Sequence, residues 1–499
     1  MGEECCGPGE SPPIDIEEVH DLLNYIAGEF HPPSSERWID DFSPATGIRI
    51  ARIPCSDQQD VDAAVSAARA ALPEWSALTH AQRADWLDKI ADALEERSEE
   101  IAQLESLDTG KPITLARTVD AARSVDNFRF FAEYVREFVP ETFDMQGATN
   151  HVVYKPVGVA GLITPWNLPL YLLSWKVAPA LVMGNTVVAK PSELTPMTAC
   201  LLAEIIDDVG LPAGVFNMVH GRGENVGALL TSHSDVDLIS FTGGTETGAK
   251  VATSASSTFK KLSLELGGKN ATIVCADADI DKTIPGVVRA GFLNQGQICL
   301  CGSRILIEES IYDEFVGRLI DETNSMKIGD PSDPETDLGA LVSAEHLAKV
   351  SGYISLAEED GGTVLTGGSQ PEGIPEQFAS GNWLAPTIID GLSPNSRCAK
   401  EEIFGPVVTL HPFSSEKEAL DIANSTDYGL AGSVWTSDLD KGRRIAEGIE
   451  TGMVWVNTWL HRDLRVPFGG IKHSGVGREG GRWSLSFYSH AVNICIKHD

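Results

Sequence analysis

Two hydrophobic patterns divide the chain. In residues 58–107 apolar positions recur at spacings of three and four, which predicts a run of helices with Thr79 and Ser98 as N-caps. From residue 159 onward, short apolar runs alternate with helical stretches. The expected strands are 159–164, 186–189, 215–220, 238–242 and 261–266, and the expected helices are 170–183, 197–209, 225–232 and 246–254. Such alternation predicts a parallel sheet covered on both faces, an α/β doubly wound nucleotide-binding architecture.

A second alternating set follows from residue 271 to about 456 and predicts a second α/β domain. Its candidate strands are 304–307, 363–365, 407–413 and 454–457. Residues 143–154 and 487–497 fit neither set and alternate like exposed strands, which often pair across a subunit interface. We therefore expect the first domain to comprise residues 1–142 and 155–265 and the second to comprise 266–465. The oligomerisation strands and C-terminal segment are then 143–154 and 466–499.

Composition narrows the possible partners. With 38 Lys and Arg against 72 Asp and Glu, the net charge of -34 disfavours nucleic acid and anionic membrane surfaces. The longest apolar stretch, residues 168–183, is interrupted by Pro169, Lys176 and Pro179 and is too short to span a bilayer. Nine cysteines without CxxC pairs or zinc-type spacing predict reduced thiols and no metal site. The first twenty residues are acidic and lack a signal pattern, so we expect a cytoplasmic protein.

The segment FLNQGQICLC, residues 292–301, places two cysteines after a turn that contains a glycine. A thiolate attacks carbonyl carbon readily, and a few per cent of an ordinary thiol is ionised near neutral pH. For an arbitrary cysteine, burial as a small hydrophobic residue is the better interpretation. The motifs around this segment decide between the two.

Taken together, the motifs resemble those of the aldehyde dehydrogenase superfamily, over residues 50–496. They are TPWNLP from Thr164, KPSE from Lys190, FTGGTETG from Phe241, LELGGKN from Leu264, the cysteine segment, EEIFGP from Glu401 and PFGGIKHSGVGRE from Pro467. The resemblance puts Cys299, and not Cys301, at the nucleophile position. It implies NAD-dependent oxidation of a small-molecule aldehyde to an acid, through a thiohemiacetal and a thioester, by a homodimer or homotetramer.

Two further residues have a chemical reason as well as a family match. A neutral side-chain amide can donate to the oxygen that becomes negative when a thiol adds to an aldehyde, and the resemblance assigns this to Asn167 with the backbone N–H of Cys299. The alternative is a turn asparagine beside Pro165 and Pro169. A carboxylate whose pKa is raised by burial can deprotonate the hydrolytic water, and Glu265 matches the general base. An isolated Glu in an apolar strand is unusual on physical grounds alone.

Glycine-rich turns at strand ends are typical of diphosphate sites. Gly243, Gly244 and Gly248 form the first candidate, and Gly223 belongs to a weaker one. Gly244 stands where many relatives carry serine, which removes one possible hydroxyl contact to phosphate.

The remaining cofactor contacts follow from the resemblance. It places Lys190 and Glu193 at the adenosine ribose, where a carboxylate repels a 2'-phosphate and favours NAD over NADP; a solvated ion pair is the alternative. It also assigns Ile163, Thr164, Pro165, Trp166, Phe241, Thr242, Leu266, Glu402 and Phe404 to cofactor contacts.

The substrate class rests on a narrower resemblance. SVDNFRFFAEY from Ser124 and WLHRDLRVPFGG from Trp459 resemble the members that oxidise muconate semialdehydes. An anionic substrate needs cationic side chains, and Arg117 and Arg462 match the expected positions, with Arg123 and Arg465 as nearby alternatives.

Several functions stay open at this point. The leading substrate is 2-aminomuconate 6-semialdehyde, of tryptophan and kynurenine catabolism, and 2-hydroxymuconate semialdehyde and retinal are alternatives. A thiol esterase and a non-catalytic structural protein are the rival classes, and the intact set of Asn167, Glu265 and Cys299 disfavours the last.

Overall fold

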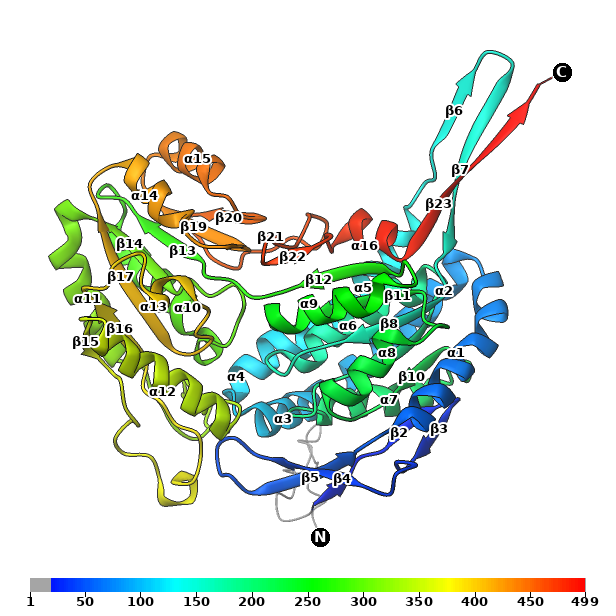
Figure 1. The fold of residues 1–499 in the computed structure, drawn as a ribbon, viewed down its shortest axis with the longest axis horizontal. Coiled ribbons are helices and arrows are strands. Elements are labelled where there is room, and N and C mark those ends of the chain that lie inside the picture. The colour runs from blue at the N-terminus through cyan, green and yellow to red at the C-terminus, as the bar shows by residue number, and fades with distance from the viewer. Residues whose placement is uncertain (1–18, 499) are drawn as a thin grey trace, which may run out of the picture.

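Residues 19–498 of the computed structural model are described here. Residues 1–18, which include most of the acidic stretch used above to infer a cytoplasmic protein, and residue 499 lie outside this description. Figure 1 shows two large sheets with their helices and a long arm of strands that projects away from them.

The first large sheet has the strand order β22-β12-β11-β8-β9-β10-β2-β3. In that order the strands are Gly475–Val476, Lys261–Glu265, Leu238–Thr242, Val159–Ile163, Thr186–Lys190, Phe216–Met218, Asn24–Ile26 and Glu29–His31. The five from β12 to β10 are parallel, and they are the five strands expected from the hydrophobic pattern. The expectation of a wholly parallel sheet is wrong at its edges, because β2, β3 and β22 pair antiparallel.

Helices cover both faces of this sheet, as expected for a doubly wound fold. They are α1 (Gln58–Ala77), α2 (His80–Glu96), α3 (Ser98–Thr109), α5 (Ala122–Arg136), α6 (Pro169–Val182), α7 (Met197–Asp208), α8 (Ala228–Ser232) and α9 (Thr245–Ser256). Thr79 caps α2 as expected and accepts from the Gln82 N–H. Ser98 is not a cap: it lies inside α3, directly after α2, and its hydroxyl donates back to the Leu94 carbonyl at 3.1 Å.

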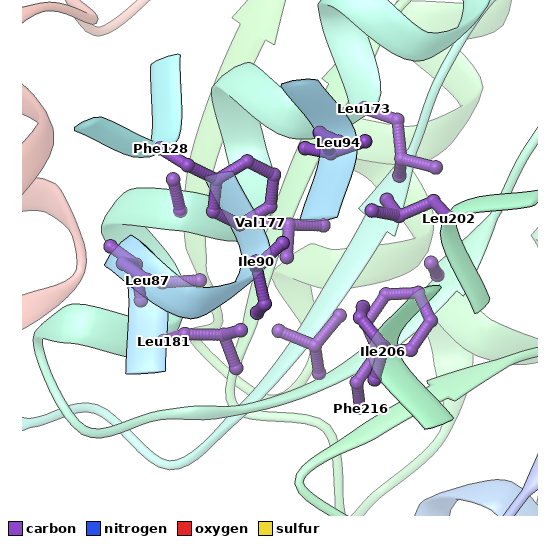
Figure 2. Packing of buried hydrophobic residues seen from close by; sticks show 14 of the residues in the cluster. Leu87, Ile90, Leu94, Phe128, Leu173, Val177, Leu181, Leu202, Ile206 and Phe216 are labelled. Atoms are coloured by element: carbon purple, nitrogen blue, oxygen red, sulfur yellow. The ribbon is translucent and has the colours of Figure 1, made fainter. Parts of the chain in front are cut away.

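Helix α6 is the centre of the larger core (Figure 2). Nearly all of its residues are buried, and it contacts β8 and β9 as well as α2, α5 and α7. The side chains that enclose it are at most 1% exposed: Leu87, Ile90 and Leu94 of α2, Phe128 of α5, Leu202 and Ile206 of α7, and Phe216 of β10. This packing fixes the N-terminal end of α6, where the TPWNLP motif lies.

The second large sheet has the order β15-β16-β17-β14-β13-β19-β20. Its strands are Thr363–Thr366, Thr387–Asp390, Val407–Phe413, Arg304–Glu308, Ala271–Val274, Ala431–Trp435 and Met453–Val456, and all but β15 are parallel. The four strands expected here are all present. Its helices are α10 (Ile280–Phe292), α11 (Tyr312–Asn324), α12 (Ala344–Glu359), α13 (Arg397–Lys400), α14 (Glu416–Ala423) and α15 (Leu439–Gly448).

The projecting arm consists of β6 (Thr142–Met145), β7 (Ala148–Pro156) and β23 (Ser489–Lys497) (Figure 1). These are the two segments expected as exposed strands, and they pair antiparallel with each other in the order β23-β7-β6. A small sheet of β1 (His20–Asp21), β5 (Arg49–Pro54) and β4 (Trp38–Phe42) lies near the N-terminal helices. The segment 466–499, expected to serve the arm, also supplies β22 and helix α16 (Gly481–Phe487) to the body.

The topology brings the motif residues to one edge of the first sheet. The parallel strands β8, β9, β11 and β12 end at Ile163, Lys190, Thr242 and Glu265, so their carboxyl ends share that edge. Between Glu265 and Ala271 the chain crosses to the second sheet. No helix among residues 19–498 combines the length and the hydrophobicity that a membrane span requires.

Candidate active site

A cavity of about 270 Å³ lies at this edge and contains the Cys299 side chain. Eight stretches of the chain contribute to its wall, from both domains. Of the residues expected at the site, it is lined by Pro165, Trp166, Asn167, Thr242, Gly243, Gly244, Glu265, Leu266, Cys299, Glu402, Phe404 and Arg462. Within residues 19–498, no group of three or more His, Cys, Asp or Glu side chains is arranged to hold a metal ion.

The two thiols of the cysteine segment have different surroundings. Cys299 lines the cavity, whereas Cys301 is 6% exposed and its Sγ lies 3.9 Å from the Leu293 carbonyl oxygen. Burial, followed by the carboxylates of Glu402 and Glu265, raises the pKa of the Cys299 thiol well above its ordinary value. The thiol at the cavity is therefore protonated at neutral pH until a base removes its proton.

The backbone of residues 293–301, here called the Cys299 loop, is held tightly. Asn294 and Gln295 adopt positive φ angles of 54° and 56°, which is strained for residues other than glycine. Five successive carbonyls, from residue 297 to residue 301, accept hydrogen bonds. The backbone N–H of Cys299 has no hydrogen-bond partner within residues 19–498. That N–H is left available to a substrate oxygen.

Asn167 lies across the cavity from this loop at the start of α6. Its Nδ2 donates to the Gln297 carbonyl at 2.8 Å, and its own carbonyl accepts from Lys111 Nζ at 3.2 Å and from Asn294 Nδ2 at 3.1 Å. An amide carries two N–H donors, so one remains for the cavity. Asn167 and the Cys299 N–H therefore form a pair of donors that fits an oxyanion.

Glu265 ends β12 and is 4% exposed. Neither of its carboxylate oxygens has a hydrogen-bond partner among the described residues. Burial and the neighbouring Glu479 carboxylate raise its pKa well above the ordinary value, and Lys176 opposes the shift. Lys176 itself donates to Glu479 at 2.8 Å. An unpaired carboxyl with a raised pKa beside the thiol fits a general base.

A glycine pair joins β12 to the second sheet and lets two site residues approach the backbone. A Cβ on Gly267 would lie 2.3 Å from Glu402 Oε2, and a Cβ on Gly268 would lie 2.8 Å from the Cys299 carbonyl oxygen. Instead the Gly268 N–H donates to Glu402 Oε1 at 2.8 Å. Burial raises the pKa of Glu402.

The other expected cofactor residues lie along the same sheet edge, outside the cavity. Lys190 Nζ donates to Glu193 Oε2 at 2.8 Å, and Glu193 Oε1 accepts from the Gly223 N–H at 3.4 Å. Although burial opposes it, the Lys190 ammonium holds the pKa of Glu193 below its ordinary value. Ile163, Phe241 and Gly248 are buried: Phe241 packs against Gly243, and Gly248 against Leu266.

A diphosphate has an open place at the first residues of α9. This helix has Gly244 as its N-cap with no side-chain hydrogen bond, and a Cβ on Gly244 would meet nothing within 4 Å. Thr164 Oγ1 is buried and has no hydrogen-bond partner among the described residues. Free N–H groups at a helix N-terminus beside an open glycine turn fit a dinucleotide.

Of the two arginines expected to bind the substrate, only Arg462 lines the cavity. The Nη1 of Arg462 donates to the Tyr171 hydroxyl at 3.0 Å. Its guanidinium lies 3.9 Å from the Phe468 ring centroid and 4.5 Å from that of Trp175. Nε and Nη2 are buried and have no hydrogen-bond partner in the described part of the chain. A guanidinium with two unpartnered donors beside a cavity has the chemistry that pairs with a carboxylate.

The placement of Arg117 corrects its expected role. Its side chain is 42% exposed, forms an ion pair with Glu99 at 2.6 Å and lines a different cavity of about 440 Å³. Arg123 lies at the start of α5, directly after the helical turn Ala116–Ala121 that contains Arg117. Its guanidinium is 5.8 Å from the centroid of the Tyr171 ring. Arg465 is exposed and paired with Asp463. Arg462 therefore lines the cavity without Arg117, and Arg123 lies beside Tyr171, whose hydroxyl accepts from Arg462.

Comparison with known proteins settles the family. The model of the aldehyde dehydrogenase family matches residues 30–494. The chain belongs to the aldehyde dehydrogenase family. It is 49% identical to 2-aminomuconic semialdehyde dehydrogenase of Danio rerio over 480 residues, covering 96% of this chain and 98% of that one. It is 47% identical to 2-hydroxymuconic semialdehyde dehydrogenase of Pseudomonas sp. (strain CF600), covering 96% and 100%.

Solved structures agree with this aldehyde dehydrogenase fold. A putative aldehyde dehydrogenase from Burkholderia cenocepacia superposes with a TM-score of 0.94 at 42% identity, covering 96% of this chain and 98% of that one. PnpE, from Pseudomonas sp. WBC-3, in complex with nicotinamide adenine dinucleotide superposes with a TM-score of 0.93 at 43% identity, covering the same shares.

Several lining residues of this aldehyde dehydrogenase site were not among the expected site residues, and three of them carry polar groups that matter for its chemistry. His346 and Lys349, at the start of α12, and Tyr171 of α6 all line the cavity. His346 Nε2 lies 2.6 Å from the Phe404 carbonyl oxygen, and its ring packs edge-on against Trp166 at 5.0 Å. The only available signal was Tyr171, a polar aromatic residue within an apolar helix. No motif surrounds the other two.

Proposed function

We propose that this chain is an NAD-dependent dehydrogenase that oxidises a short carboxylate-bearing semialdehyde to the acid, with 2-aminomuconate 6-semialdehyde as the substrate. One observation carries the proposal: Arg462 lines the same cavity as Cys299, Glu265 and Asn167, and its Nε and Nη2 have no hydrogen-bond partner among the described residues. The names of the relatives agree with it, since they act on 2-aminomuconic and 2-hydroxymuconic semialdehydes.

In the mechanism that follows, Glu265 or a water takes the proton of Cys299, and the thiolate adds to the aldehyde carbon. The oxygen of the resulting thiohemiacetal accepts from Asn167 Nδ2 and the Cys299 N–H. Bound NAD supplies the hydride acceptor that turns this thiohemiacetal into a thioester. Glu265 then deprotonates the water that attacks the thioester carbonyl, which releases the acid and frees the thiol.

The NAD assignment rests on the open first turn of α9 and on Glu193. A carboxylate beside the ribose position accepts from two hydroxyls and repels a 2'-phosphate, which favours NAD over NADP. The resident ion pair with Lys190 keeps this carboxylate charged.

A carboxylate-bearing substrate is supported by size and charge. In a chain with a net charge of -34, an unpaired guanidinium inside a cavity is a specific feature. A cavity of about 270 Å³ with a charged wall suits a short semialdehyde better than retinal, which needs a longer apolar tunnel.

The test is NADH formation, followed by absorbance, with 2-aminomuconate 6-semialdehyde, 2-hydroxymuconate semialdehyde, retinal and an uncharged aldehyde of similar length. Arg462→Met and Arg123→Met should each lower kcat/KM for the muconate semialdehydes about ten- to a hundredfold, because each removes a charge-assisted hydrogen bond of roughly 1.5–3 kcal/mol. The uncharged aldehyde should be affected much less.

Arg117→Met is the matched control, since Arg117 pairs with Glu99 away from the cavity. If the Arg462 variant lost equal activity on charged and uncharged aldehydes, Arg462 would not bind the substrate carboxylate. If wild type oxidised retinal faster than both muconate semialdehydes, the proposed substrate class would be wrong. Ester hydrolysis without any NADH formation would replace the dehydrogenase by a thiol esterase.

We also propose a homodimer or homotetramer that assembles through the arm, and a cytoplasmic location. Phe143 and Met145 of the arm are each 59% exposed, and Ile494 and Ile496 are 44% and 52% exposed. Exposed apolar side chains on strands with free edges favour pairing with a second copy. The free thiols of the described cysteines suit a reducing compartment.

A further inference from the structure

The carbonyls of the Cys299 loop are held from three directions. Asn270 Nδ2 donates to the carbonyls of Cys299 and Cys301 at 2.7 and 2.9 Å. Between them, the Leu300 carbonyl accepts from the indole Nε1 of Trp459 at 2.9 Å, and this bond is buried. The Ile298 carbonyl accepts from the Cys301 N–H at 2.9 Å. Of these donors, Trp459 lies in the same segment of the chain as Arg462.

Trp459 lies in the segment that carries Arg462. Residues 457–468, here called the Arg462 loop, run from the end of β20 to the bridge at Phe468 and contain no regular helix or strand. Two residues of this loop have positive φ angles: Asn457, with 55°, and Leu460, which follows Trp459, with 59°. These strained positions persist only where contacts hold the backbone. Trp459 is 7% exposed and packs against the cluster that contains Ile298, Leu300 and Cys301.

We infer that Trp459 is a positioning residue: through its indole N–H it fixes the Cys299 loop and sets the place of Arg462 relative to the Cys299 thiol. This inference rests on the proposed roles of Cys299 and Arg462. Arg462 follows three positions after Trp459, so the bond from Trp459 to Leu300 is a short connection between the proposed carboxylate receptor and the nucleophile. Misplacing reacting groups by about 1 Å costs on the order of a hundredfold in rate.

The alternative is that Trp459 only fills space in the core. Replacing Trp459 by phenylalanine distinguishes the two roles. Trp459→Phe keeps most of the apolar ring but removes the N–H, which leaves the buried Leu300 carbonyl without its donor. A space-filling role predicts a change in stability alone, whereas a positioning role predicts a change in kcat for each folded molecule.

The chain contains a matched control. Trp455 belongs to the neighbouring strand β20, and its indole Nε1 also donates to a backbone carbonyl at 2.9 Å, that of His461. This bond stays between β20 and the Arg462 loop and does not reach the Cys299 loop. Trp455→Phe therefore removes the same chemical group and leaves every hydrogen bond of the Cys299 loop in place.

The experiment compares Trp459→Phe, Trp459→Tyr and Trp455→Phe with wild type as purified full-length enzymes. NAD binding reports folding, and iodoacetamide labelling of Cys299, counted by mass spectrometry, gives the number of active sites. With an uncharged aldehyde we expect both Trp459 variants to lose about tenfold or more in kcat per active site, with KM for NAD unchanged. Trp455→Phe should stay within about twofold of wild type.

A second readout tests the link to Arg462. The ratio of kcat/KM for the muconate semialdehyde to that for the uncharged aldehyde should fall in Trp459→Phe. In an Arg462→Met background the same change should no longer alter this ratio, because the receptor is already gone.

Three outcomes would overturn the inference. They are an unchanged kcat in both Trp459 variants, an equal loss in Trp455→Phe, and failure of both Trp459 variants to bind NAD, which would make Trp459 purely structural. The uncharged aldehyde keeps this test separate from the proposed substrate: a wild type that oxidises it but not the muconate semialdehydes refutes the substrate, not the role of Trp459.

Discussion

At the scale of single residues, the identity of the nucleophile depends on two thiols that are two positions apart. Burial raises the pKa of both thiols, so access to the cavity separates them: Cys299 lines the cavity, whereas the Cys301 side chain lies in the apolar cluster with Trp459. A buried thiol that does not line the cavity cannot reach an aldehyde bound there.

We therefore expect Cys299→Ala to abolish NADH formation and Cys301→Ala to retain most of it. Removing one small side chain from a core of this size leaves the fold intact, so the loss in the first variant comes from the missing covalent route. Mass spectrometry of Glu265→Gln incubated with aldehyde and NAD should find the acyl adduct on the peptide at Cys299. An adduct at Cys301 would contradict the assignment.

Glu265 also makes a prediction about stability. Its pKa in the folded state is raised above the ordinary value of 4.5, so between these two values the folded state binds the proton more tightly than the unfolded chain does. The contribution of Glu265 to stability is therefore present at acidic pH and is lost as the pH rises above about 4.5 toward the raised value.

Glu265→Gln should escape this loss. Thermal unfolding without cofactor should show a Tm for the variant that exceeds that of wild type increasingly as the pH is raised from 5 to 8. A Tm difference that does not depend on pH would mean that Glu265 is not buried as a lone carboxyl. Glu246→Gln, at an exposed site of α9, is the control and should show no such trend.

At the scale of secondary structure, periodicity was sufficient for the strands at the centre of both sheets, because buried parallel strands are short apolar runs. Periodicity did not predict β22 and β2, because strands of two and three residues are too short to show a repeating pattern of buried and exposed positions. Arg117 was assigned by resemblance, which carries a position in the sequence but not the direction of a side chain. In the structure it lies in the π-helix Ala116–Ala121 and pairs with Glu99.

The catalytic trio was predictable because each member lies inside a motif whose chemistry can be argued. His346, Lys349 and Trp459 were not predicted as site residues, because they act through tertiary contacts between segments far apart in the sequence. No local pattern marks a side chain that bonds to a backbone carbonyl 159 residues away, as Trp459 does to Leu300.

The connection after β12 gives a prediction at this scale. Gly268→Ala would place a Cβ 2.8 Å from the Cys299 carbonyl oxygen and 2.9 Å from Asn270 Oδ1, so the Cys299 loop must shift. We expect kcat to fall about tenfold or more while the protein stays folded. Gly352→Ala is the control, since in α12 a Cβ there meets nothing within 4 Å. It should retain kcat and gain up to about 1 kcal/mol in stability. Equal activities of the two variants would show that the loop tolerates the shift.

At the scale of the whole molecule, the arm is the part that the rest of the chain does not cover (Figure 1). Paired residues of an antiparallel ladder share a face, and Phe143 pairs with Asn150 while Ile494 pairs with His151. Phe143 and Met145 therefore lie on one face and Ile494 and Ile496 on the other. Apolar residues on both faces of a three-stranded sheet have no core of their own to enter, so an association between copies is the arrangement that covers them.

If the arm assembles the oligomer, a charge on it should dissociate the protein. We expect Phe143→Asp to shift the mass measured by light scattering after size-exclusion chromatography toward the monomer at micromolar concentration, because an unpaired carboxylate in an apolar interface costs several kcal/mol. Phe259→Asp is the matched control: Phe259 is 94% exposed and lies between α9 and β12, outside the three strands of the arm. It should leave the mass unchanged. A wild type that is already monomeric, or equal dissociation of both variants, would contradict the role of the arm. Because none of the residues that line the cavity around Cys299 belongs to the arm, NAD binding should survive in the dissociated Phe143→Asp protein, which separates assembly from the integrity of the site.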